Sequence, residues 1–78
     1  MVTKRQYRKR TAFSALRAQE GLSQSAVADR GQVSSATIAR FEYGMAQPRL
    51  ADRRRLAKAY GVDLPHFDRL LAAEDEPS

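Results

Sequence analysis

The chain has 78 residues and a net charge of +5, which bounds it to one small basic domain. It contains no cysteine, so disulfide staples and thiolate metal sites are excluded. No apolar run approaches the roughly 18 residues of a membrane span, and the basic N-terminus lacks the apolar stretch of a signal peptide, so we expect a cytoplasmic protein without a membrane partner.

The positive charge is concentrated in the first ten residues, which carry five basic side chains and no acidic one. The remaining nine basic residues are balanced by nine acidic residues. We expect residues 1–10 to form a flexible arm that suits a polyanion such as nucleic acid, with a solubilising tail as the alternative. A short acidic tail is expected at residues 74–78, which leaves residues 11–73 as the folded domain. The basic residues of the arm are Lys4, Arg5, Arg8, Lys9 and Arg10.

The first predicted helix begins near Thr11 and ends before Gly21, a residue that readily adopts the left-handed conformation that closes a helix. Phe13 and Leu16 are spaced to form its buried stripe. Arg17 is expected on or near the outer face of this helix.

Two short helices with a tight break between them are predicted in residues 22–44. Ser23 and Ser34 are good N-cap residues for helices at about 24–30 and 35–43, because a serine oxygen accepts a hydrogen bond from the first turn. Helices joined by such a short turn cross each other in a helix-turn-helix arrangement. The apolar side chains expected to face each other across the crossing are Val27, Ala28, Val33, Ile38 and Phe41.

A fourth helix is predicted over residues 50–60, with Leu50, Leu56 and Tyr60 among its inward side chains. Arg53 falls on the same side. Because an unpaired buried charge is costly, its guanidinium is expected to reach solvent or to pair with a carboxylate. The run Arg53-Arg54-Arg55 is compatible with phosphate binding, with a solvated helix face as the alternative.

A fifth helix is predicted after Asp63, a good N-cap residue. Leu64 and Phe67 are expected in the core. Leu70 and Leu71 continue the apolar stripe beyond what a small core needs, so we predict that they form a homodimer interface, with core lining as the alternative. No segment requires a strand, and five helices with short loops predict an all-α fold.

A series of short motifs spans most of residues 13–71: Gly21-Leu22-Ser23-Gln24, Val27-Ala28, Val33-Ser34, Thr37-Ile38, Arg40-Phe41-Glu42, Gly44, Pro48 and Leu56-Ala57-Lys58-Ala59-Tyr60-Gly61-Val62. Their order and spacing resemble the lambda-repressor/Cro-like (XRE-type) family of helix-turn-helix proteins. The resemblance implies a compact five-helix lambda-repressor-like domain, in which the second and third helices form the helix-turn-helix and the third lies in the major groove of DNA.

The turn departs from that family, which usually has an apolar residue and then glycine before the position of Val33. Here Gly31 precedes Gln32, so the glycine stands one place early. Either Gln32 adopts the left-handed conformation, at a cost of roughly 1 kcal/mol, or Gly31 adopts it and the turn is rebuilt. The sequence leaves both alternatives open.

The resemblance also implies contacts to nucleic acid. Gln24 matches a family glutamine that binds a phosphate and braces the third helix. Arg40 is the only long donor expected on the outward face of that helix, and arginine is the best reader of guanine. Pairing of Arg40 with Glu42 or Asp29 would instead give it a structural role. The other expected contacts are Ser34, Ser35, Ala36, Thr37 and Ala39 on the third helix, with Thr37 alternatively a plain surface residue, and Tyr43, Gln47 and Arg49 in the loop after it.

These features predict a sequence-specific transcriptional regulator, a repressor that binds an inverted-repeat operator in double-stranded DNA as a homodimer. No enzyme activity and no cofactor are expected, because the single histidine, His66, has no second histidine or cysteine with which to share a metal. The alternative is a protein-interaction module, or an antitoxin-like protein with a protein partner, that keeps the helix-turn-helix fold. The serine- and alanine-rich third helix favours this alternative.

Overall fold

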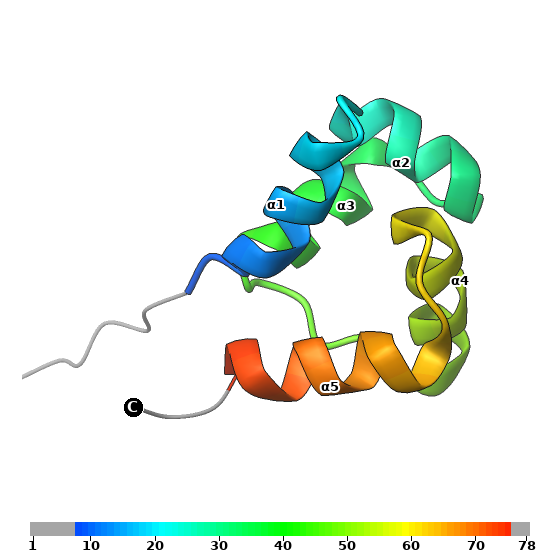
Figure 1. Ribbon diagram of the computed structural model, residues 1–78. Coiled ribbons are helices and arrows are strands. Elements are labelled where there is room, and N and C mark those ends of the chain that lie inside the picture. The colour runs from blue at the N-terminus through cyan, green and yellow to red at the C-terminus, as the bar shows by residue number, and fades with distance from the viewer. Residues whose placement is uncertain (1–7, 76–78) are drawn as a thin grey trace, which may run out of the picture.

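The computed structural model describes residues 8–75, which form five α-helices and no strand (Figure 1). The all-α prediction is therefore confirmed for this part of the chain. Within the same range, no helix has both the length and the hydrophobicity that crossing a membrane requires. The helices are α1 (Thr11–Gln19), α2 (Gln24–Gly31), α3 (Ser35–Glu42), α4 (Leu50–Tyr60) and α5 (Leu64–Asp75).

Three of these helices begin at the polar caps that the sequence predicts. Ser23 Oγ accepts a hydrogen bond from the backbone N–H of Ala26, and Ser34 Oγ accepts one from Thr37, both at 3.1 Å. Asp63 Oδ1 accepts a bond of 2.8 Å from the N–H of His66. Each bond satisfies a donor that the first helical turn leaves unpaired, which explains the positions of these helix starts.

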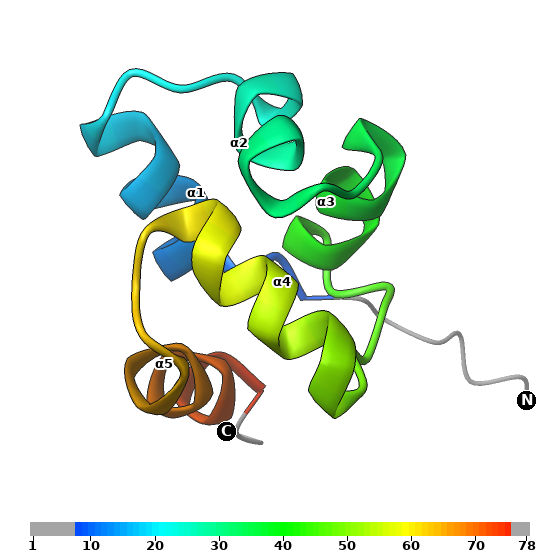
Figure 2. The same ribbon diagram turned by 90° about the vertical axis from the view of Figure 1, so that its right-hand side faces the viewer.

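The core is built around aromatic rings contributed by four helices. The ring of Phe13 on α1 lies 4.9 Å from that of Phe41 on α3, 5.2 Å from that of Tyr60 on α4 and 5.1 Å from that of Phe67 on α5. Figure 2 shows α4 between α3 and α5, with α2 above it. The predicted apolar side chains of the crossing helices are buried around these rings, with Val33 partly buried: Val27, Ala28, Ile38 and Phe41.

The turn between α2 and α3 takes the first of the two alternatives. Gln32 has φ 58° and ψ 42°, which is the left-handed conformation, while Gly31 remains in the last turn of α2. A Cβ atom at Gly31 would lie 2.7 Å from both the Cβ of Ala59 and the carbonyl oxygen of Arg55. The glycine therefore stands one place early because α4 approaches the backbone of α2 closely at this point.

Replacing Gln32 with glycine is expected to raise the free energy of unfolding by about 0.5–1 kcal/mol. Glycine adopts positive φ without the steric cost of a Cβ atom, although it adds entropy to the unfolded chain. Urea denaturation at neutral pH measures the change. Gly31→Ala is the matched control and should destabilise the protein, because its new methyl group meets Ala59. A loss of stability in Gln32→Gly would contradict this account of the turn.

Two predictions about apolar side chains are wrong. Leu50, expected inside, is 50 % exposed. Leu71, expected at a dimer interface, belongs to the core at 9 % exposure, and Leu70 packs against that core. The α5 stripe closes the core of this small domain, so Leu71 takes the alternative of core lining, while Leu70 is only partly buried.

The charged residues at the ends of the domain also differ from the prediction. The guanidinium of Arg10 is 1 % exposed and pairs with Asp75 at 2.9 Å. Helix α5 continues through Glu74 and Asp75, so these residues are not part of a separate tail. The folded domain therefore extends from residue 10 to residue 75. Arg53 behaves as predicted, since it pairs with Asp68 at 3.4 Å.

Candidate nucleic-acid interface

The outward face of α3 carries the small side chains and the one arginine that the sequence placed there. Ser35, Ala36 and Arg40 are exposed, and Ala39 is half-buried. Within residues 8–75, the Arg40 side chain forms no ion pair with Glu42 or Asp29, so the structural role considered for it is not observed. The guanidinium of Arg40 is available at the surface of the helix.

Ser34 and Thr37 form a local hydroxyl pair at the start of the same helix. Their oxygens lie 2.8 Å apart, and Ser34 Oγ also caps the helix. Thr37 is half-buried. Its hydroxyl is therefore engaged within the protein, while the exposed Ser34 lies at the helix N-terminus, where a phosphate is favoured.

A buried carboxylate lies behind α3, and the sequence considered it only as a possible partner of Arg40. Glu42 is 5 % exposed. Its Oε2 accepts hydrogen bonds from Arg17 Nε at 2.8 Å and from the Tyr60 hydroxyl at 2.7 Å. Its Oε1 accepts bonds from Arg17 Nη2 at 3.0 Å and from Gln24 Nε2 at 3.1 Å. The carboxylate thus joins α1, α2, α3 and α4, and the expectation that Arg17 lies on an outer face is wrong.

The ionisation of this cluster follows from its contacts. Burial acts to raise the pKa of Glu42, but the hydrogen bonds from Arg17, Tyr60 and Gln24 and the charge of Arg17 outweigh it and hold the pKa below its ordinary value of 4.5. Burial, together with the bond to Glu42, raises the pKa of the Tyr60 hydroxyl. The hydrogen bond to Glu42 raises the pKa of Arg17. The cluster is therefore a charged pair with a neutral tyrosine at neutral pH.

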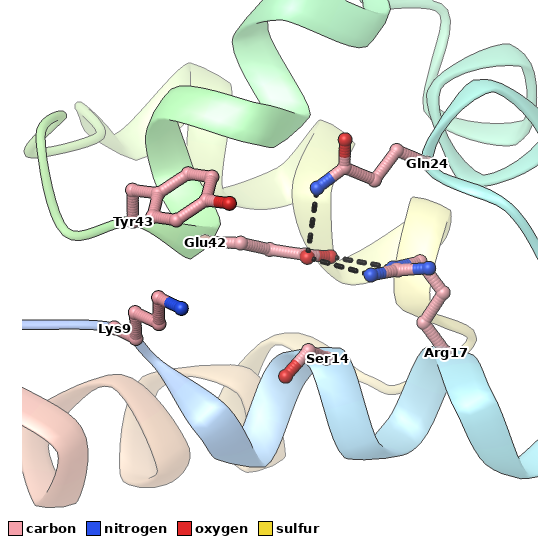
Figure 3. Close-up of a pocket in the computed structure, with 6 residues that line it drawn as sticks. All are labelled: Lys9, Ser14, Arg17, Gln24, Glu42 and Tyr43. Carbon is pink, nitrogen blue, oxygen red and sulfur yellow. Dashed lines mark hydrogen bonds and ion pairs between the residues drawn. The ribbon is translucent and has the colours of Figure 1, made fainter.

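Gln24 is held in place by this cluster at the first position of α2. One amide hydrogen of Gln24 is used by Glu42, and Figure 3 shows the amide nitrogen directed at the carboxylate and the oxygen directed away from it. The amide nitrogen has a second hydrogen that can be donated to an incoming acceptor. Gln24 is thus oriented before any ligand arrives.

A groove of about 200 Å³ lies in front of the cluster (Figure 3). The ammonium group of Lys9 lies 5.2 Å from the ring centroid of Tyr43, on one side of this groove. The groove is also lined by the amide of Gln24 and the hydroxyl of Tyr43, and the negative charge of the lining Glu42 is paired with Arg17. Such a set of donors suits a phosphate oxygen. The lining residues are Lys9, Ser14, Arg17, Gln24, Glu42 and Tyr43.

The loop after α3 contributes further polar side chains. Arg49 is exposed and stands at the N-cap of α4 without capping that helix through its side chain. Gln47 is exposed, and its amide nitrogen donates a hydrogen bond of 3.3 Å to Asp75. Gln47 and Arg49 therefore lie at the surface, as a role in binding requires.

Of the three basic arm residues that the structure describes, two are exposed and one is buried. Arg8 and Lys9 are exposed. Arg10 is buried with its guanidinium occupied by protein acceptors, so its assignment as a nucleic-acid contact is wrong. Lys4 and Arg5 lie outside the described residues.

The crossing of α2 and α3 through a three-residue turn, with the outward face of α3 exposed, defines a small helix-turn-helix domain. A family model described as a helix-turn-helix domain matches residues 5–70, and the chain belongs to that family. Among solved structures, the chain is similar to the crystal structure of the clp gene regulator ClgR from C. glutamicum. The TM-score is 0.69 and the sequence identity 17 %, over 88 % of this chain and 90 % of that chain. No curated protein matches the sequence.

Proposed function

We propose that the protein is a Cro-like transcriptional regulator that binds double-stranded DNA with α3 in the major groove. The observation that carries the proposal is the exposed Arg40, which is not ion-paired to Glu42 or Asp29 and is the only cation on the outward face of α3. Arginine can donate two parallel hydrogen bonds to guanine, whereas the side chains of Ser35 and Ala36 are too short to form such a pair. The proposal includes no catalytic step and no cofactor, and it places the protein in the cytoplasm.

The groups beside α3 support contacts to the DNA backbone. Lys9 and Tyr43 lie at one end of the helix, next to the groove in which Gln24 is oriented. Arg49 is exposed at the N-cap of α4 and suits a phosphate or a narrow minor groove. Phosphate contacts of this kind fix the orientation of the protein, while Arg40 supplies the readout of a base.

We further propose that the protein is a repressor that binds an inverted repeat as a homodimer. A single eight-residue α3 with one long donor reads few base pairs, and a second half-site about one helical turn away would double that information. The description of ClgR as a gene regulator is in line with a regulatory role. Leu71 is buried in the core, so the interface of this homodimer would have to draw on other, exposed side chains.

The salt dependence of duplex binding tests the proposed function. With about six phosphate contacts, the affinity should fall roughly 10³-fold between about 50 and 200 mM salt, since each contact contributes a slope of about −0.9. A fluorescent duplex of mixed sequence is a suitable probe, followed by a duplex selected from a random pool. Absence of duplex binding at low salt would contradict the proposal and favour the protein-interaction or antitoxin-like alternative.

A further inference from the structure

The buried guanidinium of Arg10 connects the two ends of the domain. Its Nε and Nη2 atoms donate to the two carboxylate oxygens of Asp75, at 2.9 and 3.0 Å. Its Nη1 atom donates to the carbonyl oxygens of Phe41, at 2.7 Å, and of Ala46, at 2.8 Å. The guanidinium carbon also lies 4.6 Å from the ring centroid of Phe41. Arg10 thus binds the end of α3, the following loop and the end of α5 at once.

This anchor lies next to Arg8 and Lys9, the two described residues that precede it. The backbone N–H of Arg10 donates to the carbonyl oxygen of Glu42 at 2.7 Å. The backbone of Arg8 lies directly over Gly44. A Cβ atom at Gly44 would collide with the Arg8 carbonyl oxygen. Lys9 lies over the ring of Tyr43. Arg8 and Lys9 therefore lie along the C-terminal end of α3.

The carboxylate of Asp75, in the last turn of α5, also contacts the loop between α3 and α4. Asp75 accepts a hydrogen bond from Gln47, which lies in the loop between α3 and α4. The neighbouring Glu74 accepts hydrogen bonds from the backbone N–H of Ala12 and the hydroxyl of Thr11. In Figure 1 the start of the described chain and the C-terminal end of α5 lie at the same end of the domain.

We propose that Asp75 is a positioning residue for nucleic-acid binding. Through Arg10 it holds Arg8 and Lys9 at the end of α3, and through Gln47 it holds the loop that follows this helix. Side chains that are ordered before binding lose less conformational entropy when they meet phosphates. This inference rests on the proposed function and assigns to α5, which has no predicted nucleic-acid contact of its own, a part in setting the affinity.

Removal of the Asp75 charge should release the anchor without unfolding the domain. A buried guanidinium that loses its carboxylate partner is strongly disfavoured, so Arg10 should move toward solvent and carry Arg8 and Lys9 with it. Asp75 is at the end of a helix and 28 % exposed, so few core contacts depend on it. The substitution therefore acts mainly on the positions of Arg8, Lys9 and the loop.

The test compares three full-length variants with the wild type. Asp75→Asn removes the charge, and Asp75→Glu restores it. Asp68→Asn is the matched control, because it removes a carboxylate of α5 that pairs with Arg53 and makes the same change in net charge. Each variant is measured for the affinity and salt slope on a mixed-sequence duplex and for hydrogen exchange of the Arg10 amide in the free protein.

Asp75→Asn should bind the duplex roughly five- to tenfold more weakly than wild type with a flatter salt slope, the loss expected when one or two side chains must be ordered on binding. Its Arg10 amide should exchange roughly tenfold faster or more. Asp75→Glu should recover most of the duplex affinity and most of the protection of the Arg10 amide. Asp68→Asn should bind the duplex at least as well as wild type. Equal behaviour of Asp75→Asn and Asp68→Asn on the duplex would overturn the inference.

The exchange measurement separates this inference from the proposed function. If the wild type binds no duplex, the proposed function fails and the positioning role fails with it, while the exchange rates still decide whether Asp75 anchors Arg10. If the wild type binds and the Arg10 amide exchanges equally in Asp75→Asn and Asp68→Asn, the proposed function stands and the anchor is refuted.

Discussion

Replacing Glu42 with alanine is expected to lower the free energy of unfolding by about 3 kcal/mol, because breaking a buried ion pair leaves an uncompensated charge. The variant removes the acceptor shared by Arg17, Gln24 and Tyr60. Arg17 is 21 % exposed and regains some hydration, which keeps the loss toward the lower end of the range for buried pairs. Urea denaturation at neutral pH measures it.

Two controls separate the charge from the other contacts of Glu42. Tyr60→Phe removes one hydrogen bond and should cost about 1 kcal/mol. The double variant Arg17→Met/Glu42→Leu should be destabilised by less than the sum of Arg17→Ala and Glu42→Ala, because no charge is left unpaired. A loss of less than about 1 kcal/mol in Glu42→Ala would show that the cluster contributes little beyond a surface pair.

The same carboxylate gives the stability a defined pH dependence. Its pKa in the folded protein lies below the ordinary 4.5, so its contribution is complete above that pH and is lost as the pH falls through the folded value. Glu42→Gln lacks this component. The difference in stability between wild type and Glu42→Gln should therefore be constant near neutral pH and should narrow as the pH is lowered below 4.5. A difference that widens on acidification would contradict the depressed pKa.

Replacing Arg40 with alanine should weaken binding to a duplex selected by the wild type by about 1–3 kcal/mol and relax the preference at one base pair per half-site. The guanidinium is exposed on α3 and is not ion-paired to Glu42 or Asp29, so its loss removes a base contact and few internal ones. Affinities for the selected and a scrambled duplex, with melting temperatures, measure the effect.

Arg49→Ala is the matched control for Arg40, since it removes an exposed arginine from the loop rather than from α3. It should weaken binding to both duplexes more evenly, as expected for a backbone contact. An equal loss on both duplexes in Arg40→Ala would make Arg40 a phosphate contact. A change in melting temperature alone would restore its structural role and move base recognition to Ser35, Ala36 or the arm.

The sequence by itself determined the helices, the N-caps of three of them and the crossing of α2 and α3. These features depend on neighbours within one or two turns, such as Ser34 and the N–H of Thr37, and on the spacing of apolar residues such as Ile38 and Phe41. The exposure of Arg40 followed in the same way from its place between those two residues. Local hydrogen bonds and helical period are therefore enough to position the candidate recognition face.

Only the tertiary structure decided which charged and apolar side chains find partners across the domain. Arg10 and Asp75 are 65 positions apart, and Arg17 and Glu42 are 25 apart, so no local spacing links either pair. The charge pattern predicts that Arg10 belongs to an arm and that Arg17 lies at the surface. A cation is buried only where a carboxylate or carbonyl groups pair with it, and here those partners are distant in the sequence. Leu71 is in the core for the related reason that α5 closes the end of a small aromatic core.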